Sequence, residues 1–144
     1  MALKIELKPG ERIILGQAVI TNGDTRTRLV VEGEAPILRE KDILAAKEAN
    51  TSAKRIYLAV QLMYLAQDPL KIQDDYIELV KEFLNAVPSS FPIIEEINNH
   101  ILTGSIYKAL KAAKQLIDYE KELLNHAQRN ASLCENIPNN SGAA

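Results

Sequence analysis

LKIELKPGERIILGQAVITNGDTRTRLVVEG, residues 3–33, is the stretch that decides the fold of the N-terminal part. Leu3, Ile5 and Leu7 alternate with charged neighbours, which is the period of a strand with one buried face. Turn signals interrupt the alternation at Pro9-Gly10, at Gly16 and at Asn22-Gly23, a strong hairpin dipeptide. The pattern predicts five short strands, at residues 3–8, 12–15, 17–21, 25–31 and 37–40.

The predicted strand unit is small for a self-sufficient core. Five strands within about forty residues bury little apolar surface on their own. We therefore expect this unit to pack against the rest of the chain, against a second copy, or against both. A homodimer built through the β unit is the oligomer that this reasoning predicts.

After Ile43 the apolar period changes from that of strands to that of helices. The stretch AKRIYLAVQLMYLA, residues 53–66, is apolar on nearly every side of a helix, so we expect it to be buried nearly all round. Further helices are predicted at about 72–86, 91–102 and 105–128. The prediction is an α+β fold, with a five-stranded β unit (1–46), a bundle of about four helices (47–128) and a disordered tail (129–144).

Composition excludes some classes of function. The formal net charge is -2, and basic and acidic residues are evenly spread, unlike proteins that grip long nucleic acids by charge alone. A local basic patch remains compatible with this composition. The single cysteine, Cys134, forms no intrachain disulfide, charged residues at once interrupt the N-terminal apolar residues, and no apolar run spans a bilayer. We expect a cytoplasmic protein that does not enter membranes.

The residues that usually carry catalysis are sparse. His100 and His126 lie far apart in the sequence, with no cysteine or carboxylate at metal-ligand spacing beside them. Cys134 sits in a polar segment that offers nothing to lower its pKa. The glycines match no phosphate-binding loop. We therefore expect a binding protein without cofactor or metal, and not an enzyme.

Several long segments resemble the FlbT family of bacterial flagellar regulators. They are LKPGERIILG (7–16), AVITN (18–22), APILREKDI (35–43), AKRIYLAVQLMY (53–64) and INNHILTG (97–104). The resemblance covers about residues 1–128 and implies a role in flagellum biogenesis. It implies control of flagellin synthesis after transcription through the untranslated leader of flagellin mRNA, with repression by transcript decay in at least some members.

Residues 3–43 also resemble the small mRNA-binding protein family CsrA. The matching positions are Gly10-Glu11, Gly16, Ala35-Pro36, Arg39-Glu40 and Ile43, although the stretch from Pro36 to Arg39 is shorter than in that family. The resemblance implies a dimer of interlocked strands, with RNA lying along the first and last strands of opposite subunits. The candidate RNA-binding residues are Leu3, Lys4, Lys8, Arg39 and Glu40.

Two other interpretations stay open. Basic residues that alternate with apolar ones, such as Lys4, Lys8, Arg26 and Arg28, are also typical of the solvated face of any half-buried sheet. The helical part can instead serve as an adaptor that binds flagellin, another flagellar regulator or a decay factor, with only indirect contact to RNA. Among the basic residues Arg39 is the strongest candidate, because it matches a motif as well as a period.

Overall fold

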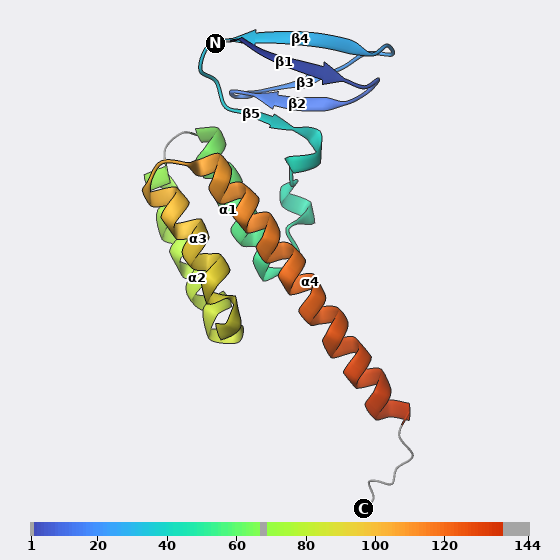
Figure 1. Ribbon diagram of the computed structural model, residues 1–144, viewed down its shortest axis with the longest axis vertical. Coiled ribbons are helices and arrows are strands. Elements are labelled where there is room, and N and C mark those ends of the chain that lie inside the picture. The colour runs from blue at the N-terminus through green and yellow to red at the C-terminus, as the bar shows by residue number, and fades with distance from the viewer. Residues whose placement is uncertain (1, 67–68, 137–144) are drawn as a thin grey trace, which may run out of the picture.

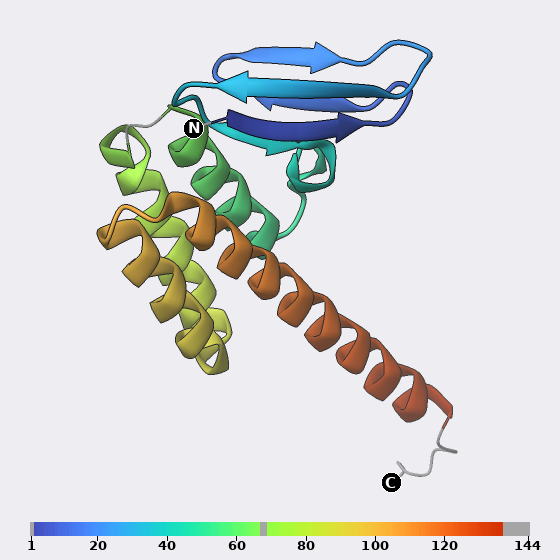
Figure 2. The same cartoon turned by 45° about the horizontal axis from the view of Figure 1, so that its top comes forward.

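The computed structural model describes residues 2–66 and 69–136, and in these the predicted α+β order of strands followed by helices is confirmed. The strands are β1 (Ala2–Leu7), β2 (Arg12–Leu15), β3 (Ala18–Thr21), β4 (Thr27–Glu32) and β5 (Ile37–Arg39). The α-helices are α1 (Ser52–Ala66), α2 (Gln73–Ala86), α3 (Phe91–Leu102) and α4 (Ile106–Asn136). All strands lie together at one end of the helices, and β5 is the strand nearest to them (Figure 1 and Figure 2).

The strands form two small antiparallel sheets that pack face to face. One sheet contains β1 and β4, and the other has the order β3-β2-β5. The residues buried between them are Ile5, Leu7 and Ile13, with Ile20, Leu29, Val31 and Ile37 packed around them. The alternation in residues 3–7 predicts this buried face. Because the sheets cover each other, the β unit closes a small core within one chain.

Asn22-Gly23 does not form the predicted hairpin, because β3 and β4 belong to different sheets. Asn22 Nδ2 donates hydrogen bonds to the carbonyl oxygens of Leu7, Lys8 and Thr25. A two-residue hairpin of this composition needs positive φ at both central residues, and Gly23 is not among the described glycines with positive φ. The asparagine side chain instead fixes a corner at which the chain passes from one sheet to the other.

The three-stranded sheet is the middle layer of the molecule. Ile14 and Leu38 are paired across β2 and β5, and both pack against the main helical core. The hydroxyl of Tyr64, on α1, donates to the carbonyl oxygen of Ile37 at 3.0 Å and accepts from its backbone N–H at 3.2 Å. The helices therefore hold β5 both through apolar contact and through its backbone.

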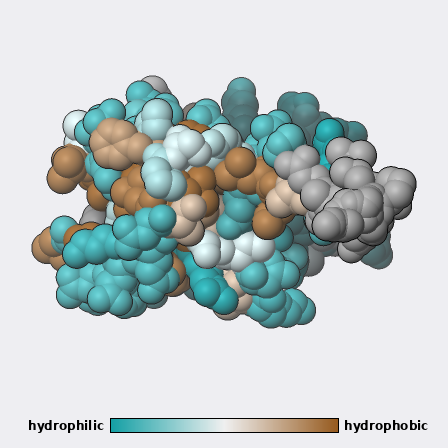
Figure 3. All heavy atoms as spheres, turned by 90° about the horizontal axis from the view of Figure 1, so that it is seen from below, coloured by the Kyte–Doolittle hydropathy of each residue, from teal (hydrophilic) through white to brown (hydrophobic). Residues whose placement is uncertain are grey.

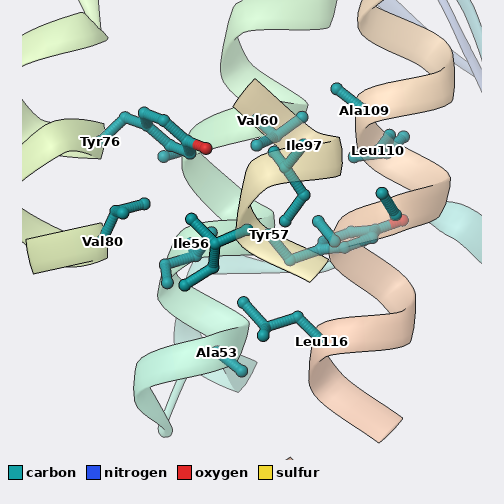
Figure 4. Packing of buried hydrophobic residues seen from close by; sticks show 14 of the residues in the cluster. Ala53, Ile56, Tyr57, Val60, Tyr76, Val80, Ile97, Ala109, Leu110 and Leu116 are labelled. Atoms are coloured by element: carbon teal, nitrogen blue, oxygen red, sulfur yellow. The ribbon is translucent and has the colours of Figure 1, made fainter. Parts of the chain in front are cut away.

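Helix α1 packs against α2 and α4, and α3 packs against α4. Ile56 and Val60 of α1 meet Tyr76 of α2, Ile97 of α3 and Leu110 of α4 in the core (Figure 4). Gln61 is also buried, and its amide makes two hydrogen bonds with the backbone of Leu44, which explains a polar residue in this apolar helix.

The prediction that α1 is buried nearly all round is wrong for one stripe within a single chain. Leu62 is 45% exposed and Leu58 is half-buried, on the side that faces α2. The molecule seen from below also shows apolar surface between hydrophilic groups (Figure 3), and neither Leu58 nor Leu62 belongs to the buried core cluster. The unpaired apolar stripe is therefore a surface feature of this chain, and not part of the core.

Helix α4 continues to Asn136, beyond the predicted end at Gln128, and it extends past the other helices (Figure 1). Its last buried residue among those with described side chains is Leu116. Alanine, leucine and glutamate in this segment have high helix propensity, so the helix does not need an apolar stripe to continue. The prediction that the tail 129–144 is disordered is therefore wrong for residues 129–136, which are helical, and its remainder, 137–144, lies outside the described residues. Within the described ranges, no helix has an apolar stretch that could cross a bilayer.

Candidate nucleic-acid interface

Arg39 ends β5 and connects the two sheets. Its Nη2 atom donates a hydrogen bond to the carbonyl oxygen of Glu6, on β1, at 2.8 Å, and lies 3.8 Å from Oε2 of Glu11. The Arg39 side chain is nevertheless 44% exposed. Because a guanidinium carries five N–H donors, one structural hydrogen bond orients Arg39 and leaves donors for a ligand.

A polar cleft of about 660 Å³ opens around Arg39. Its lining comes from the end of β1, from the turn before β2, from the loop before β4 and from the segment after β5. The lining residues are Glu6, Lys8, Pro9, Gly10, Glu11, Arg26, Arg39, Glu40 and Lys41. The structure thus brings together Lys8, Arg39 and Glu40, three of the five candidates.

The local turn geometry explains the glycine at position 10, beside the cleft. Gly10 has φ +74°, a conformation that side chains with a Cβ rarely adopt, and a Cβ built there would meet nothing within 4 Å. The backbone N–H of Glu11 closes the turn by donating to the carbonyl oxygen of Lys8 at 3.0 Å. This turn places Lys8 and Glu11 beside Arg39.

The charges of the cleft are partly paired. Four cationic side chains (Lys8, Arg26, Arg39, Lys41) face three carboxylates (Glu6, Glu11, Glu40), which leaves a net charge of +1. Arg26 Nε lies 3.0 Å from Glu6 Oε1, and Arg12 Nε lies 3.4 Å from Glu40 Oε1. Exposed ion pairs of this kind contribute about 0–1 kcal/mol, so a phosphate can exchange for a carboxylate at low cost.

Leu3 and Lys4 lie elsewhere, opposite Val31 and Val30 in the β1–β4 ladder. Leu3 is 51% exposed on the face that carries Ile5 and Leu7, and Val30 is 56% exposed on the opposite face, beside Lys4. Neither Leu3 nor Lys4 is among the residues that line the cleft. The single RNA-binding edge implied by the CsrA resemblance is therefore divided into two places on one chain.

Strand pairing also differs from the interlocked arrangement which that resemblance implies. In this chain β1 pairs with β4, and β5 pairs with β2, all within one copy. The first and last strands still approach each other, since Arg39 at the end of β5 bonds to Glu6 on β1. The proximity of first and last strand is thus achieved inside the chain.

Sequence reasoning missed an ion-pair cluster around a buried carboxylate beside the cleft, formed by Asp42, Lys111 and Lys114. Asp42 follows Lys41 in a short 3-10 helix and is only 3% exposed. Lys114 Nζ and Lys111 Nζ on α4 lie 2.8 Å and 3.2 Å from its carboxylate, and the hydroxyl of Tyr57 donates to its carbonyl oxygen. Burial raises the pKa of Asp42, but the hydrogen bonds from Lys114 and Lys111 outweigh it and leave the pKa below its ordinary value. No local sequence pattern links these positions.

The two histidines lie apart. His100, on α3, has Nε2 at 3.8 Å from Oε1 of Glu96, and His126 is exposed on α4. Among the side chains that the structure describes, at residues 2–66 and 70–129, no three of His, Cys, Asp or Glu gather as a metal site would require. The described arrangement of the β unit is suited to binding an anionic or polar polymer across an open cleft.

Comparison with known proteins matches the chain to the family model described as "Flagellar protein FlbT" over residues 3–124. It is 60% identical over 124 residues to the "Probable flagellum biosynthesis repressor protein FlbT 1" of Bradyrhizobium diazoefficiens, covering 85% of each chain. It is 57% identical to the corresponding Rhodopseudomonas palustris protein, covering 87% of this chain and 99% of the relative. The Caulobacter vibrioides "Flagellum biosynthesis repressor protein FlbT" is 37% identical, over 92% of this chain and 96% of the relative. No solved structure matches the chain.

Proposed function

The chain belongs to the FlbT family of flagellar proteins, and from this premise we propose that it represses flagellum biosynthesis by binding the untranslated leader of flagellin mRNA in the cytoplasm. Repression of flagellum biosynthesis is the function named for its relatives. The mRNA target is the finer part of the proposal. Binding would control translation or decay of the transcript.

The proposal that RNA is the target rests on the position and contacts of Arg39. Its guanidinium is oriented by a backbone carbonyl and half exposed in a cleft that also contains Lys8, Arg26 and Lys41. A guanidinium can hold a phosphate in two-pronged fashion, stack on an unpaired base or bond to a base edge. Carboxylates beside it accept hydrogen bonds from base amino groups. The cleft thus offers partners both for the backbone and for the bases of a single strand.

The modest net charge sets the expected character of the binding. With a net charge of only +1 in the cleft, few phosphates are neutralised, so affinity must come in good part from base contacts. We therefore expect a shallow salt dependence and a clear preference for the leader over unrelated RNA. This preference distinguishes the proposal from adventitious attraction between charges.

The test is a titration of purified protein, freed of nucleic acid, against a flagellin leader RNA and an unrelated RNA of equal length. The titration is repeated at two salt concentrations. Tighter binding of the leader at both salt concentrations supports the proposal. Equal binding of both RNAs, or no binding, rejects RNA as the direct target.

A second function, that of a protein adaptor, is favoured by one surface of the helical unit. A groove of about 390 Å³ lies between α1 and α2, with an apolar floor that includes Leu58, Leu62 and Leu79. Asp75, Glu78 and Glu82 line its α2 side, and Arg55 lies on its α1 side. Among the side chains that the structure describes, none of these three carboxylates is in an ion pair. The groove therefore fits an amphipathic partner helix with basic flanks.

This adaptor function is tested by measuring binding of purified flagellin, or of another flagellar regulator, to the wild type and to Leu62→Asp. The charge introduced on the groove floor should abolish binding. Leu124→Asp is the matched control, because Leu124 is an exposed leucine on α4 that does not line the groove. Equal loss in both variants, or none in either, excludes the groove as the docking site.

A further inference from the structure

A pocket of about 630 Å³ lies on the side of the helical unit that adjoins β5. It is formed by the C-terminal part of α1, the turn before α4 and the first turn of α4. Its lining consists of Met63, Tyr64, Gly104, Ser105, Ile106, Tyr107 and Lys108. These described lining residues include two aromatic rings and one cation but no carboxylate, in contrast to the cleft around Arg39.

Tyr64 and Tyr107 pack against each other on one side of the pocket. Their ring centroids lie 5.8 Å apart with the planes tilted by 50°. Tyr64 cannot turn freely, because its hydroxyl makes two hydrogen bonds with the backbone of Ile37. Tyr107 packs against this fixed ring and is 42% exposed. A ring that is held by a neighbour and still open to solvent is suited to stacking.

Positive charge lies close to the exposed ring. Lys111 Nζ is 5.1 Å from the Tyr107 ring centroid, within the range of a cation–π interaction. This lysine also bonds to Asp42, which orients it. Lys108, which lines the pocket, is in no ion pair among the described side chains, so its ammonium group is free for a phosphate.

We propose that this pocket receives one unpaired nucleobase of RNA, which stacks on Tyr107 while Lys108 contacts the adjoining phosphate. Apolar surface, an aromatic face and a nearby cation are the combination by which proteins bind bases of single strands. The inference rests on the proposed RNA-binding function and adds to it a second contact region. Neither Tyr107 nor Lys108 belongs to the cleft around Arg39.

The two regions lie near opposite ends of one short strand. Tyr64 is bonded to Ile37, the first residue of β5, and Arg39 is the last residue. At about 3.3 Å per residue, these two strand positions are roughly 7 Å apart. The cleft and the pocket are therefore close enough for one single strand of RNA to contact both.

The experiment compares the affinity of the full chain for leader RNA in three variants. Tyr107→Leu removes the ring and should weaken binding about tenfold, because stacking of one base is typically worth about 1–3 kcal/mol and 1.4 kcal/mol is tenfold. Tyr107→Phe keeps the ring and should bind within about twofold of the wild type. Phe91→Leu removes an exposed aromatic side chain that does not line the pocket, and should bind as the wild type does.

A second measurement separates stacking from a structural role. Leader RNAs with a single abasic position are titrated against the wild type and Tyr107→Leu. At one position the abasic RNA should bind the wild type about tenfold more weakly and should lose nothing further with Tyr107→Leu. Losses that add at every position would mean that Tyr107 acts on the fold, and would overturn the inference. If Tyr107→Leu does not fold, Lys108→Gln is compared with the wild type on leader RNAs that carry one uncharged methylphosphonate linkage, and at one linkage the two losses should not add.

The outcomes distinguish this inference from the proposed function. If the wild type binds the leader specifically and Tyr107→Leu binds equally well, the pocket inference is overturned and the proposed function stands. If the wild type binds no RNA, both the pocket inference and the proposed function are overturned. A selective loss with Tyr107→Leu that Tyr107→Phe restores, together with one non-additive abasic position, supports both.

Discussion

Lys114 Nζ lies 2.8 Å from Oδ1 of Asp42, although 72 residues separate them along the chain. Asp42 is almost fully buried, and Lys111 contacts the same carboxylate from one turn earlier on α4. This contact fixes the segment that follows β5 against the first half of α4. Lys41 lines the cleft, and the first turn of α4 lines the aromatic pocket. The Asp42 carboxylate therefore fixes the position of the cleft relative to the pocket.

Removing the charge of Asp42 should weaken the contact between this segment and α4 and so lower the stability of the fold. Hydrogen bonds to charged groups contribute about 1.5–3 kcal/mol each, and the partial exposure of both lysines places the expected loss at the lower end. We expect Asp42→Asn to lower the free energy of unfolding by about 1–2 kcal/mol in urea at pH 7. Asp118→Asn, an exposed carboxylate on the same helix, is the control and should change it by less than about 0.5 kcal/mol. Equal stability of the two variants would contradict the role of Asp42.

The same carboxylate should give the stability a pH dependence. The folded pKa of Asp42 is lowered, so the unfolded state takes up this proton at higher pH than the folded state does. The stabilisation is therefore fully present above the ordinary carboxyl pKa of about 3.9 and is lost as the pH falls through the folded pKa. The difference in unfolding free energy between wild type and Asp42→Asn should be constant from pH 6 to 7 and shrink below about pH 4. A difference that grows on acidification would show that the sign is wrong.

The sequence predicts which segments are strands and helices better than it predicts how they meet. Alternation places Ile5 and Leu7 on a buried face, and both are buried. Nothing in the alternation shows that β1 pairs with β4, because strand partners are set by packing in three dimensions. Asn22-Gly23 suggested a hairpin, yet hydrogen bonds from Asn22 to three backbone carbonyls outweighed this local preference.

The candidate site was predictable only in part for the same reason. Lys8, Arg39 and Glu40 were indicated by motif and period, and they line one cleft. Arg26 and Lys41 also line it, but their contribution depends on how the two sheets are stacked. The sequence did not indicate Tyr107 at all. Its candidacy depends on the contact between its ring and that of Tyr64, which no local sequence pattern predicts.

Truncation after Gln128 should leave the folded core intact. The last buried residue of α4 is Leu116 among the side chains that the structure describes, so the distal part of the helix adds little packing. We expect the thermal unfolding midpoint to stay within error while the helical signal in circular dichroism falls slightly. A clear fall in the midpoint or in solubility would show that the distal segment packs against something.

We propose that the protein is a homodimer joined through its β unit. β1 and β4 form a two-stranded sheet, so among the described strands each has an unpaired edge, and Leu3 and Val30 expose apolar side chains on the two faces of this sheet. Light scattering at micromolar concentration should give twice the chain mass. The double variant Leu3→Glu/Val30→Glu should give the monomer mass, and Leu102→Glu, an exposed leucine at the end of α3, should remain dimeric. A monomer mass for the wild type would rule the dimer out.

Arg39→Ala should weaken leader RNA binding by about ten- to a hundredfold, because one well-placed arginine contact is typically worth about 1–3 kcal/mol. Stability should fall by no more than about 1 kcal/mol, since the hydrogen bond from Arg39 to the Glu6 carbonyl is exposed. Arg28→Ala is the control, because Arg28 is exposed on β4 outside the cleft, and Arg26→Ala is a third variant, because Arg26 lines the cleft. The measurement is a titration of leader RNA against all three variants and the wild type at one fixed salt concentration, with unfolding curves to show that each is folded.

The affinity of Arg26→Ala should lie between those of the other two variants, because the Arg26 guanidinium is already paired with Glu6. Unchanged affinity of a folded Arg39→Ala variant would remove the cleft from the RNA path, and the adaptor function through the α1–α2 groove would then be better supported than RNA binding through the cleft.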